Sequence, residues 1–232
     1  MRNLLLLSLT AAVLFSACST TSNVPKKKAY EGFYEENPTS ILLMPPINKS
    51  TNVEAKEYFH STLNMPLANR GYYVIPPFLS MEILKQESAY DAELFLESPL
   101  NKFREVFGAD LVVFTIIHKW DKSGLAANVN VEVEYLIKSA VTNELIYSRR
   151  GDVTYDASVS TGLGGLGGLV ADLAASAIST AVKKYVDVAR ACNAYTLSDM
   201  PVGIYHPEHG QDGDEMAGKS EFKATINRNS GY

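Results

Sequence analysis

Residues 111–117 read Leu-Val-Val-Phe-Thr-Ile-Ile and are apolar at every position except Thr115. A run that is apolar on both faces is typical of a central strand covered on both sides. Upstream, residues 41–44 and 72–75 are shorter apolar runs, each followed by a pair of prolines, and they predict two further strands. Helical patterns lie between them, at residues 53–70, 79–87 and 99–107. The order β-α-β-α-α-β predicts an α/β core.

The predicted helix at residues 53–70 carries a buried stripe at a spacing of four residues, formed by Phe59, Leu63 and Leu67. Pro66 lies inside this pattern. Because proline has no backbone N–H, it predicts a kink or an end to the regular helix.

Downstream of residue 117 the pattern changes to alternation. Residues 129–137 and 144–159 each alternate apolar and polar side chains, which predicts an antiparallel hairpin with one wet face. Matching the apolar faces sets a register, whose pairs are Val131 with Val153, Ile137 with Tyr147, and Glu134 with Arg150. The same register places Glu132 opposite Asp152, an unfavourable pair.

Five glycines between residues 162 and 168 precede an Ala- and Ser-rich helix predicted at residues 169–191. Residues 162–167 match G-x-G-x-x-G, but the motif follows the fifth strand and Asp187 lies in the helix itself, so a dinucleotide site is not predicted. The small residues predict close packing, within the monomer or against another surface.

Residues 40–195 are therefore predicted to form a single α/β sandwich with a mixed sheet of about five strands. Residues 196–232 are polar and Gly-rich, and we predict a largely disordered tail.

The amino terminus predicts export. Arg2 and the apolar residues 4–15 form a secretory signal that is too short to cross a bilayer as a helix. Ser16-Ala17-Cys18 follows and resembles a bacterial lipobox, which predicts a signal peptide at residues 1–17 and lipidation of Cys18. The alternative is an ordinary signal peptide with an incidental cysteine. Residues 18–39 show no helical or strand period and are predicted to be a lipidated flexible tether.

Composition and charge argue against several function classes. The formal net charge is −5 and no basic stripe is present, so nucleic acid is a poor candidate partner. His60 and His118 lie far apart in sequence, with no nucleophile motif or paired carboxylates nearby. We predict no catalytic residues, no cofactor and no small-molecule substrate.

Several potential metal ligands lie close together near the carboxyl terminus: His206, Glu208, His209, Asp212 and Asp214. They could in principle bind a transition metal. Their Pro- and Gly-rich surroundings provide no preorganisation, so we do not predict a metal site.

Cys192 is the only thiol that remains once Cys18 is lipidated. It lies at the end of an apolar helical stretch. The sequence leaves two readings open, a buried inert thiol or a disulfide between chains.

Three segments, residues 41–50, 70–74 and 102–110, together with the lipobox, resemble the GNA-type bacterial lipoprotein family of unknown function. The resemblance implies an α/β fold similar to the amino-terminal domain of TolB and the periplasmic domain of the curli secretion channel CsgG. It implies no catalytic residues, and it implies other envelope lipoproteins as neighbours.

The resulting hypothesis is a non-enzymatic lipoprotein of the outer membrane, anchored through Cys18, whose periplasmic domain binds other proteins or itself. Ser19 follows the cysteine, and the lack of Asp there favours outer-membrane sorting by the rule known for such lipoproteins. The alternative is an oligomeric subunit of a CsgG-like secretion channel. A third reading, an enzyme or a small-ligand binder, requires a deep pocket with convergent polar groups.

Overall fold

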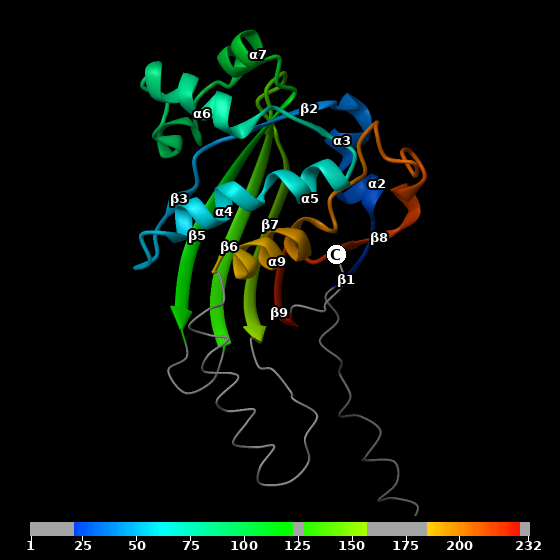
Figure 1. Cartoon of the computed structure of the whole chain (residues 1–232). Coiled ribbons are helices and arrows are strands. Elements are labelled where there is room, and N and C mark those ends of the chain that lie inside the picture. The colour runs from blue at the N-terminus through cyan, green and yellow to red at the C-terminus, as the bar shows by residue number, and fades with distance from the viewer. Residues whose placement is uncertain (1–20, 123–127, 157–184, 228–232) are drawn as a thin grey trace, which may run out of the picture.

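The computed structural model describes residues 21–122, 128–156 and 185–227. Within them, seven strands form one mixed sheet in the order β4-β2-β5-β6-β7-β9, with β3 paired to β5 at the side (Figure 1). The strands are β2 Ser40–Leu43, β3 Ile47–Asn48, β4 Tyr73–Val74, β5 Leu111–Lys122, β6 Asn128–Ser139, β7 Leu145–Asp156 and β9 Glu221–Asn227. The predicted α/β class with a mixed sheet is confirmed, and β3 and β9 are additional to the five strands expected.

The strand directions combine two kinds of pairing. β2 runs parallel to both β4 and β5, and β9 runs parallel to β7. The pairs β5–β6 and β6–β7 are antiparallel. This matches the change in the sequence from fully apolar runs to alternation, because β2 and the first residues of β5 are covered on both faces.

Helices cover both faces of β2 and of the first residues of β5. The helices are α2 Lys26–Ala29, α3 Glu31–Glu36, α4 Ala55–Thr62, α5 Asn64–Asn69, α6 Pro77–Gln86, α7 Asn101–Phe107 and α9 Tyr185–Leu197, with 3-10 turns η2 Ala92–Phe95 and η3 Asp212–Asp214. α4, α5 and α9 lie across one face (Figure 1), where their side chains join Leu43 and Val113 in the larger core cluster. α6 and α7 cover Leu42 and Val112 on the other face.

The predicted helix at residues 53–70 is broken into α4 and α5, with Leu63 between them. Pro66 cannot donate to the carbonyl of Thr62, four residues earlier, so a continuous helix would lack that bond. The stripe is confirmed, since Phe59, Leu63 and Leu67 are all fully buried.

The hairpin has the predicted register. Val131 pairs with Val153, Ile137 with Tyr147, Glu134 with Arg150, and Glu132 with Asp152. Glu132 is neutralised by a neighbour on the diagonal, because Arg150 donates to its Oε1 atom from Nε at 2.9 Å and from Nη2 at 2.6 Å. The opposed carboxylates therefore do not prevent this register.

The prediction of a flexible tether is wrong for the residues that the structure describes. From residue 21 the chain forms β1 Thr21–Pro25, α2 and α3, and β1 pairs with β8 Met216–Gly218 in a second, two-stranded sheet. The segment folds because Tyr30 and Phe33 are buried against Tyr147. The ring centroid of Tyr147 lies 5.2 Å from that of Tyr30 and 6.4 Å from that of Phe33.

The prediction of a disordered tail is also wrong as far as residue 227. β9 pairs with β7 over seven residues, from Arg150–Glu221 to Asp156–Asn227. Phe222 and Ile226 alternate with exposed residues and are buried. The Gly-rich, polar composition of residues 196–232 did not predict this short strand.

Residues 1–20 and 157–184 lie outside the described residues, so the signal peptide, Cys18, the glycine motif and the first part of the predicted helix at 169–191 are not placed. The second part of that helix is α9. No helix of the described residues is long and apolar enough to cross a membrane.

Candidate functional site

The turn between α5 and β4 crosses the chain near residue 203 at very short range. Gly203 N donates to Arg70 O at 2.7 Å, and Tyr205 N donates to Gly71 O at 3.1 Å. A Cβ atom on Gly203 would lie 2.4 Å from Gly71 O, and Gly71 has a φ of +84°. Both glycines are required for this crossing, which brings residues 199–215 against the sheet.

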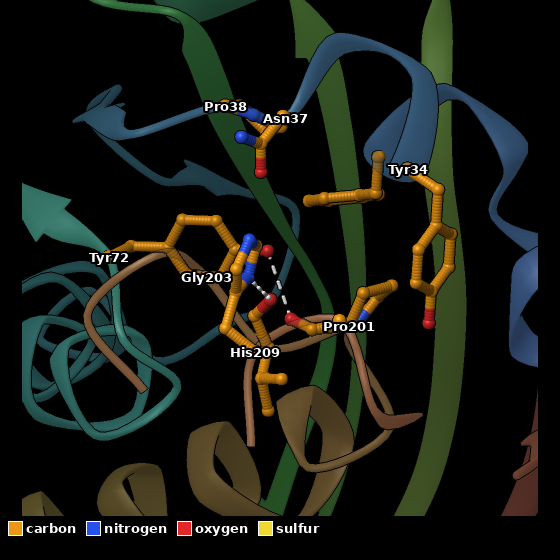
Figure 2. Close-up of a pocket in the computed structure, with 10 residues that line it drawn as sticks. Tyr34, Asn37, Pro38, Tyr72, Pro201, Gly203 and His209 are labelled. Carbon is orange, nitrogen blue, oxygen red and sulfur yellow. Dashed lines mark hydrogen bonds between the residues drawn. The ribbon is translucent and has the colours of Figure 1, made fainter. Parts of the chain in front are cut away.

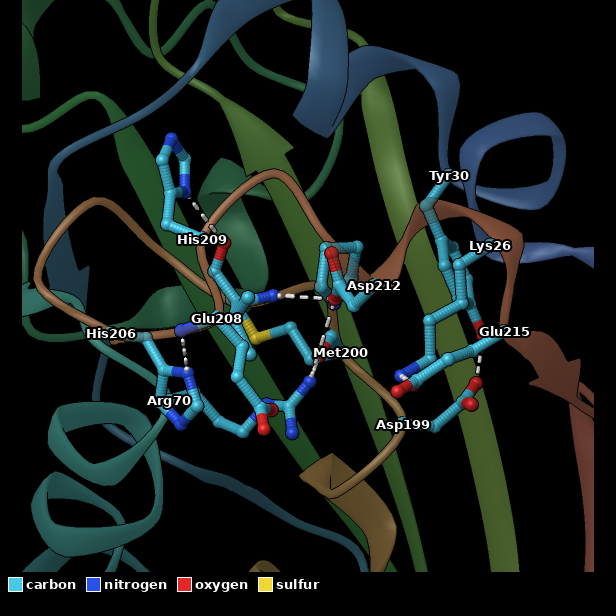
Figure 3. A network of polar contacts seen from close by, with 12 residues as sticks. Lys26, Tyr30, Arg70, Asp199, Met200, His206, Glu208, His209, Asp212 and Glu215 are labelled. Carbon is cyan, nitrogen blue, oxygen red and sulfur yellow. Dashed lines mark hydrogen bonds and ion pairs between the residues drawn. The ribbon is translucent and has the colours of Figure 1, made fainter.

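Asp212 is a buried carboxylate that stabilises this segment (Figure 3). It accepts hydrogen bonds from Val202 N at 2.9 Å and from Tyr34 Oη at 3.1 Å. Arg70 Nη2 lies 3.9 Å from its Oδ2 atom, and the same guanidinium donates to Met200 O. Burial and the Asp212 charge raise the pKa of Tyr34, so its hydroxyl stays protonated and donates.

A pocket of about 280 Å³ lies between this segment and α3 (Figure 2). Its lining is mainly aromatic and proline side chains: Phe33, Tyr34, Pro38, Tyr72 and Pro201, with Asn37, Val202, Gly203, His209 and Gly210. Tyr72 Oη donates to Pro201 O at 2.9 Å, and His209 Nδ1 lies 3.2 Å from Val202 O. These polar groups bond within the wall, and the surface of the pocket is more apolar than polar.

Asn37 is the exception at the rim. It ends α3 in the left-handed conformation, with φ 46°, and it is exposed. Its side-chain amide makes no hydrogen bond to the rest of the described chain, and Figure 2 shows it directed toward the pocket. An amide in this position can both donate to and accept from a bound peptide group.

Exposed apolar side chains lie next to the pocket. Ile204 and Tyr205 follow the lining residue Gly203 and are 44% and 68% exposed. Tyr73 on β4 is 54% exposed, but it projects from the other face of the sheet, because its neighbours Tyr72 and Val74 pack in the larger core cluster. Of the described strands, β2 alone pairs with β4, so β4 is a sheet edge. Pocket, apolar rim and strand edge are features of protein contact sites.

The potential metal ligands have other roles in the structure. His206 Nδ1 accepts from Glu208 N at 3.2 Å, while Asp212 points into the protein. Within residues 21–122, 128–156 and 185–227 there is no group of three or more residues arranged to hold a metal.

The structure keeps the two histidines apart. His60 lies in α4, where burial lowers its pKa, and His118 on β5 contacts Glu134 at 2.8 Å. Neither one lines the pocket.

Cys192 is fully buried, and burial raises the pKa of its thiol. The reading of a buried thiol is confirmed, because a thiol with no exposed surface cannot reach another chain. Arg70, Tyr72 and Asp212 were not identified from the sequence as residues of this site. The segment at residues 70–74 was recognised only as a resemblance, and its partners lay in the supposed tail.

Residues 28–206 match the family model described as "Putative lipoprotein GNA1162-like". The chain belongs to this family. The resemblance seen in the sequence is thereby confirmed, and the chain is a member of a lipoprotein family of unknown function.

One relative and two solved structures show what this chain is similar to. "Putative lipoprotein NMB1124/NMB1162" of Neisseria meningitidis serogroup B is 29% identical over 161 residues, 67% of this chain and 69% of that protein. The crystal structure of lipoprotein GNA1162 from Neisseria meningitidis has a TM-score of 0.46 at 21% identity, covering 63% of this chain and all of that one. The PelC dodecamer from Paraburkholderia phytofirmans gives a TM-score of 0.37 at 14% identity, over 70% and 86% of the two chains.

Proposed function

We propose that this protein is an outer-membrane lipoprotein, anchored through Cys18, whose periplasmic domain binds an extended segment of another envelope protein. Membership of a lipoprotein family supports the anchor. Ser19, in place of Asp, supports sorting to the outer membrane.

The aromatic pocket with its exposed rim carries the proposal of protein binding. Its walls present aromatic and proline surfaces, which contact proline or aromatic side chains favourably. Ile204 and Tyr205 extend the apolar surface beyond the pocket, and Asn37 offers one free amide. A peptide that places one proline or aromatic side chain in the pocket would contact all of these groups.

The electrostatics of the pocket support a binding role without catalysis. Burial raises the pKa values of Tyr34 and Tyr72, so neither phenol can act as a base near neutral pH. His209 is bonded to the wall through Nδ1. The chemistry that these groups offer is recognition.

The alternative of a CsgG-like channel subunit has less support. Its one favourable feature is the length of β6 and β7, twelve residues each. The apolar face of this hairpin is already buried, since Val131, Val133 and Tyr135 lie in the core with α9. A strand cannot present the same face to lipid. Light scattering in detergent separates the two proposals, because a channel subunit would form a closed oligomer.

Photo-crosslinking in living cells tests the binding site. A benzophenone amino acid at Tyr205 is expected to give a discrete adduct with an envelope protein, and the same probe at Val106 on α7, which is 60% exposed, serves as a matched control. Asn37→Gly keeps the left-handed backbone and removes the amide, so it should weaken the Tyr205 adduct. Equal labelling at both positions would contradict the proposal.

Fractionation tests the anchor. Cys18→Ser should release the domain from membranes. Ser19→Asp, by the same sorting rule, should leave the protein lipidated but move it to the inner membrane. A Cys18→Ser protein that remains with the outer membrane would overturn the anchor.

A further inference from the structure

The distance between the proposed lipid anchor and the folded domain is very short. This inference rests on lipidation of Cys18, as proposed above. Thr21, the first residue of β1, is only three residues after Cys18. A fully extended chain spans at most about 3.6 Å per residue, so the two Cα atoms lie within about 11 Å of each other. Thr21 is therefore held at the level of the lipid headgroups.

β1 is bound firmly to β8. Thr21 pairs with Gly218 and Pro25 with Met216. Ser22 Oγ donates to Ala217 O at 2.9 Å, and Lys26 N donates to Glu215 O at 2.8 Å. β1 is therefore part of the folded domain and is not a flexible tether.

Lys26 strengthens this attachment with its side chain. Its ammonium lies 2.6 Å from Glu215 Oε2, and the residue is 5% exposed. Lys26 is thus a buried structural residue and is not available to lipid headgroups.

β8 is in turn bound to the main sheet. Gly218 N donates to Asp199 Oδ1 at 2.7 Å, and Tyr30 Oη donates to the same carboxylate (Figure 3). Arg149 on β7 donates to Thr196 O at 2.8 Å and to Lys219 O at 3.3 Å. The start of β1 at Thr21 is thereby fixed relative to the main sheet.

An open groove of about 660 Å³ lies beside β1. It is bounded by β1, the first residues of β7 and the turn between β8 and β9. Val24 and Leu145 are exposed apolar side chains of its lining, at 38% and 52%, and Lys219 adds a cation beside the carboxylate of Glu221. Apolar side chains beside a lysine suit the boundary between headgroups and acyl chains.

We propose that the short anchor holds the part of this groove nearest β1 and the β8–β9 turn, defined by Val24, Lys219 and Ser220, against the phospholipid headgroups of the membrane. The domain then has one fixed orientation on the bilayer. α7, at the end of the molecule away from β1, faces the periplasm (Figure 1).

Depth-dependent fluorescence quenching tests the orientation. The lipidated full chain is reconstituted in vesicles of phosphatidylethanolamine and phosphatidylglycerol that carry a nitroxide-labelled lipid. A thiol-reactive fluorophore is attached at Ser220→Cys or, as a control, at Lys102→Cys on α7, both of which are exposed positions. Cys192 is fully buried and does not compete for the label.

Quenching several-fold stronger at position 220 than at position 102 is expected. Equal quenching at the two positions would overturn the proposal. A flexible insert of 20 Gly and Ser residues between Thr20 and Thr21 has a root-mean-square reach of about 25 Å. It should lower the quenching at position 220 to the level at position 102, and unchanged quenching would contradict the role of the short anchor.

The test separates this inference from the anchor itself. A wild-type chain that does not float with vesicles and carries no lipid would refute lipidation. A lipidated chain that floats, but is quenched equally at both positions, would refute only the orientation.

Discussion

The Nζ atom of Lys223 lies 2.9 Å from the Oδ2 atom of Asp152. Asp152 faces Glu132 across the hairpin, so β6 and β7 alone would leave two carboxylates opposite each other. Arg150 bonds to Glu132, and β9 brings Lys223 to Asp152. The carboxyl-terminal strand therefore completes the charge pattern of the sheet as well as its hydrogen bonds.

Replacing Phe222 tests whether β9 belongs to the core. Its ring is buried and lies 4.4 Å from the Arg149 guanidinium. Phe222→Ala should lower the free energy of unfolding by about 3 kcal/mol in urea denaturation. Lys223→Ala, at the next and exposed position, is the matched control and should have a much smaller effect. Equal effects of the two variants would contradict a packed β9.

Asp110 should stabilise the start of β2. Its Oδ2 atom accepts from Thr39 N at 2.9 Å and Ser40 N at 3.1 Å, and Arg104 Nη1 lies 2.7 Å from Oδ1. Burial alone would raise the pKa of Asp110, but these bonds outweigh burial and lower it. Asp110→Ala should cost about 2 kcal/mol at pH 7.

The pH dependence of that loss follows from the sign of the pKa shift. A depressed pKa in the folded state gives stability that is present above the unfolded value, about 3.9, and is lost as the pH falls through the folded value. The difference between wild type and Asp110→Ala should therefore shrink below about pH 4. A difference that is independent of pH would show that the ionised carboxylate is not responsible.

His60 should make the domain less stable in mild acid. Burial lowers its pKa, although the charge of Glu57 opposes this effect and Lys56 reinforces it. The folded state binds fewer protons than the unfolded state below about pH 6.5, so stability falls from there toward the folded pKa. His60→Gln should flatten the loss between pH 7 and pH 5 in thermal melts, and an unchanged slope would contradict this assignment.

Gly203→Ala should disrupt the pocket segment. The new Cβ atom would lie 2.4 Å from Gly71 O. This backbone oxygen cannot move aside as the end of a flexible side chain could. Gly210→Ala is the control, because its Cβ would meet nothing within 4 Å and only its φ of +75° is unfavourable, at about 1 kcal/mol. We expect a larger loss of stability and a weaker Tyr205 crosslink for Gly203→Ala. Equal losses for the two variants would contradict the close crossing.

The sequence was sufficient for elements whose stability is local or strongly patterned. Residues 111–117 are apolar on both faces, and the structure covers both faces of β5. The alternation in the hairpin was enough to set Val131 opposite Val153. Pro66 located the break between α4 and α5 to within a few residues.

Elements that depend on distant partners could not be predicted. β1 is held by β8, and Lys26 pairs with Glu215, 189 residues later. The pocket could not be predicted for the same reason. Arg70 and Tyr72 bond to Met200 and Pro201, which are about 130 residues later in the chain. A polar segment with two or three aromatic residues shows no period that would reveal such partners.

The central claim is that Cys18 carries lipid and begins the mature chain, directly before a folded domain. Mass spectrometry of the amino-terminal peptide, purified from the cell envelope, tests it most directly. The account predicts a peptide that begins at Cys18, with lipid on both the thiol and the amino group. A peptide with a free Cys18 thiol, or one that retains residues upstream of Cys18, would contradict it.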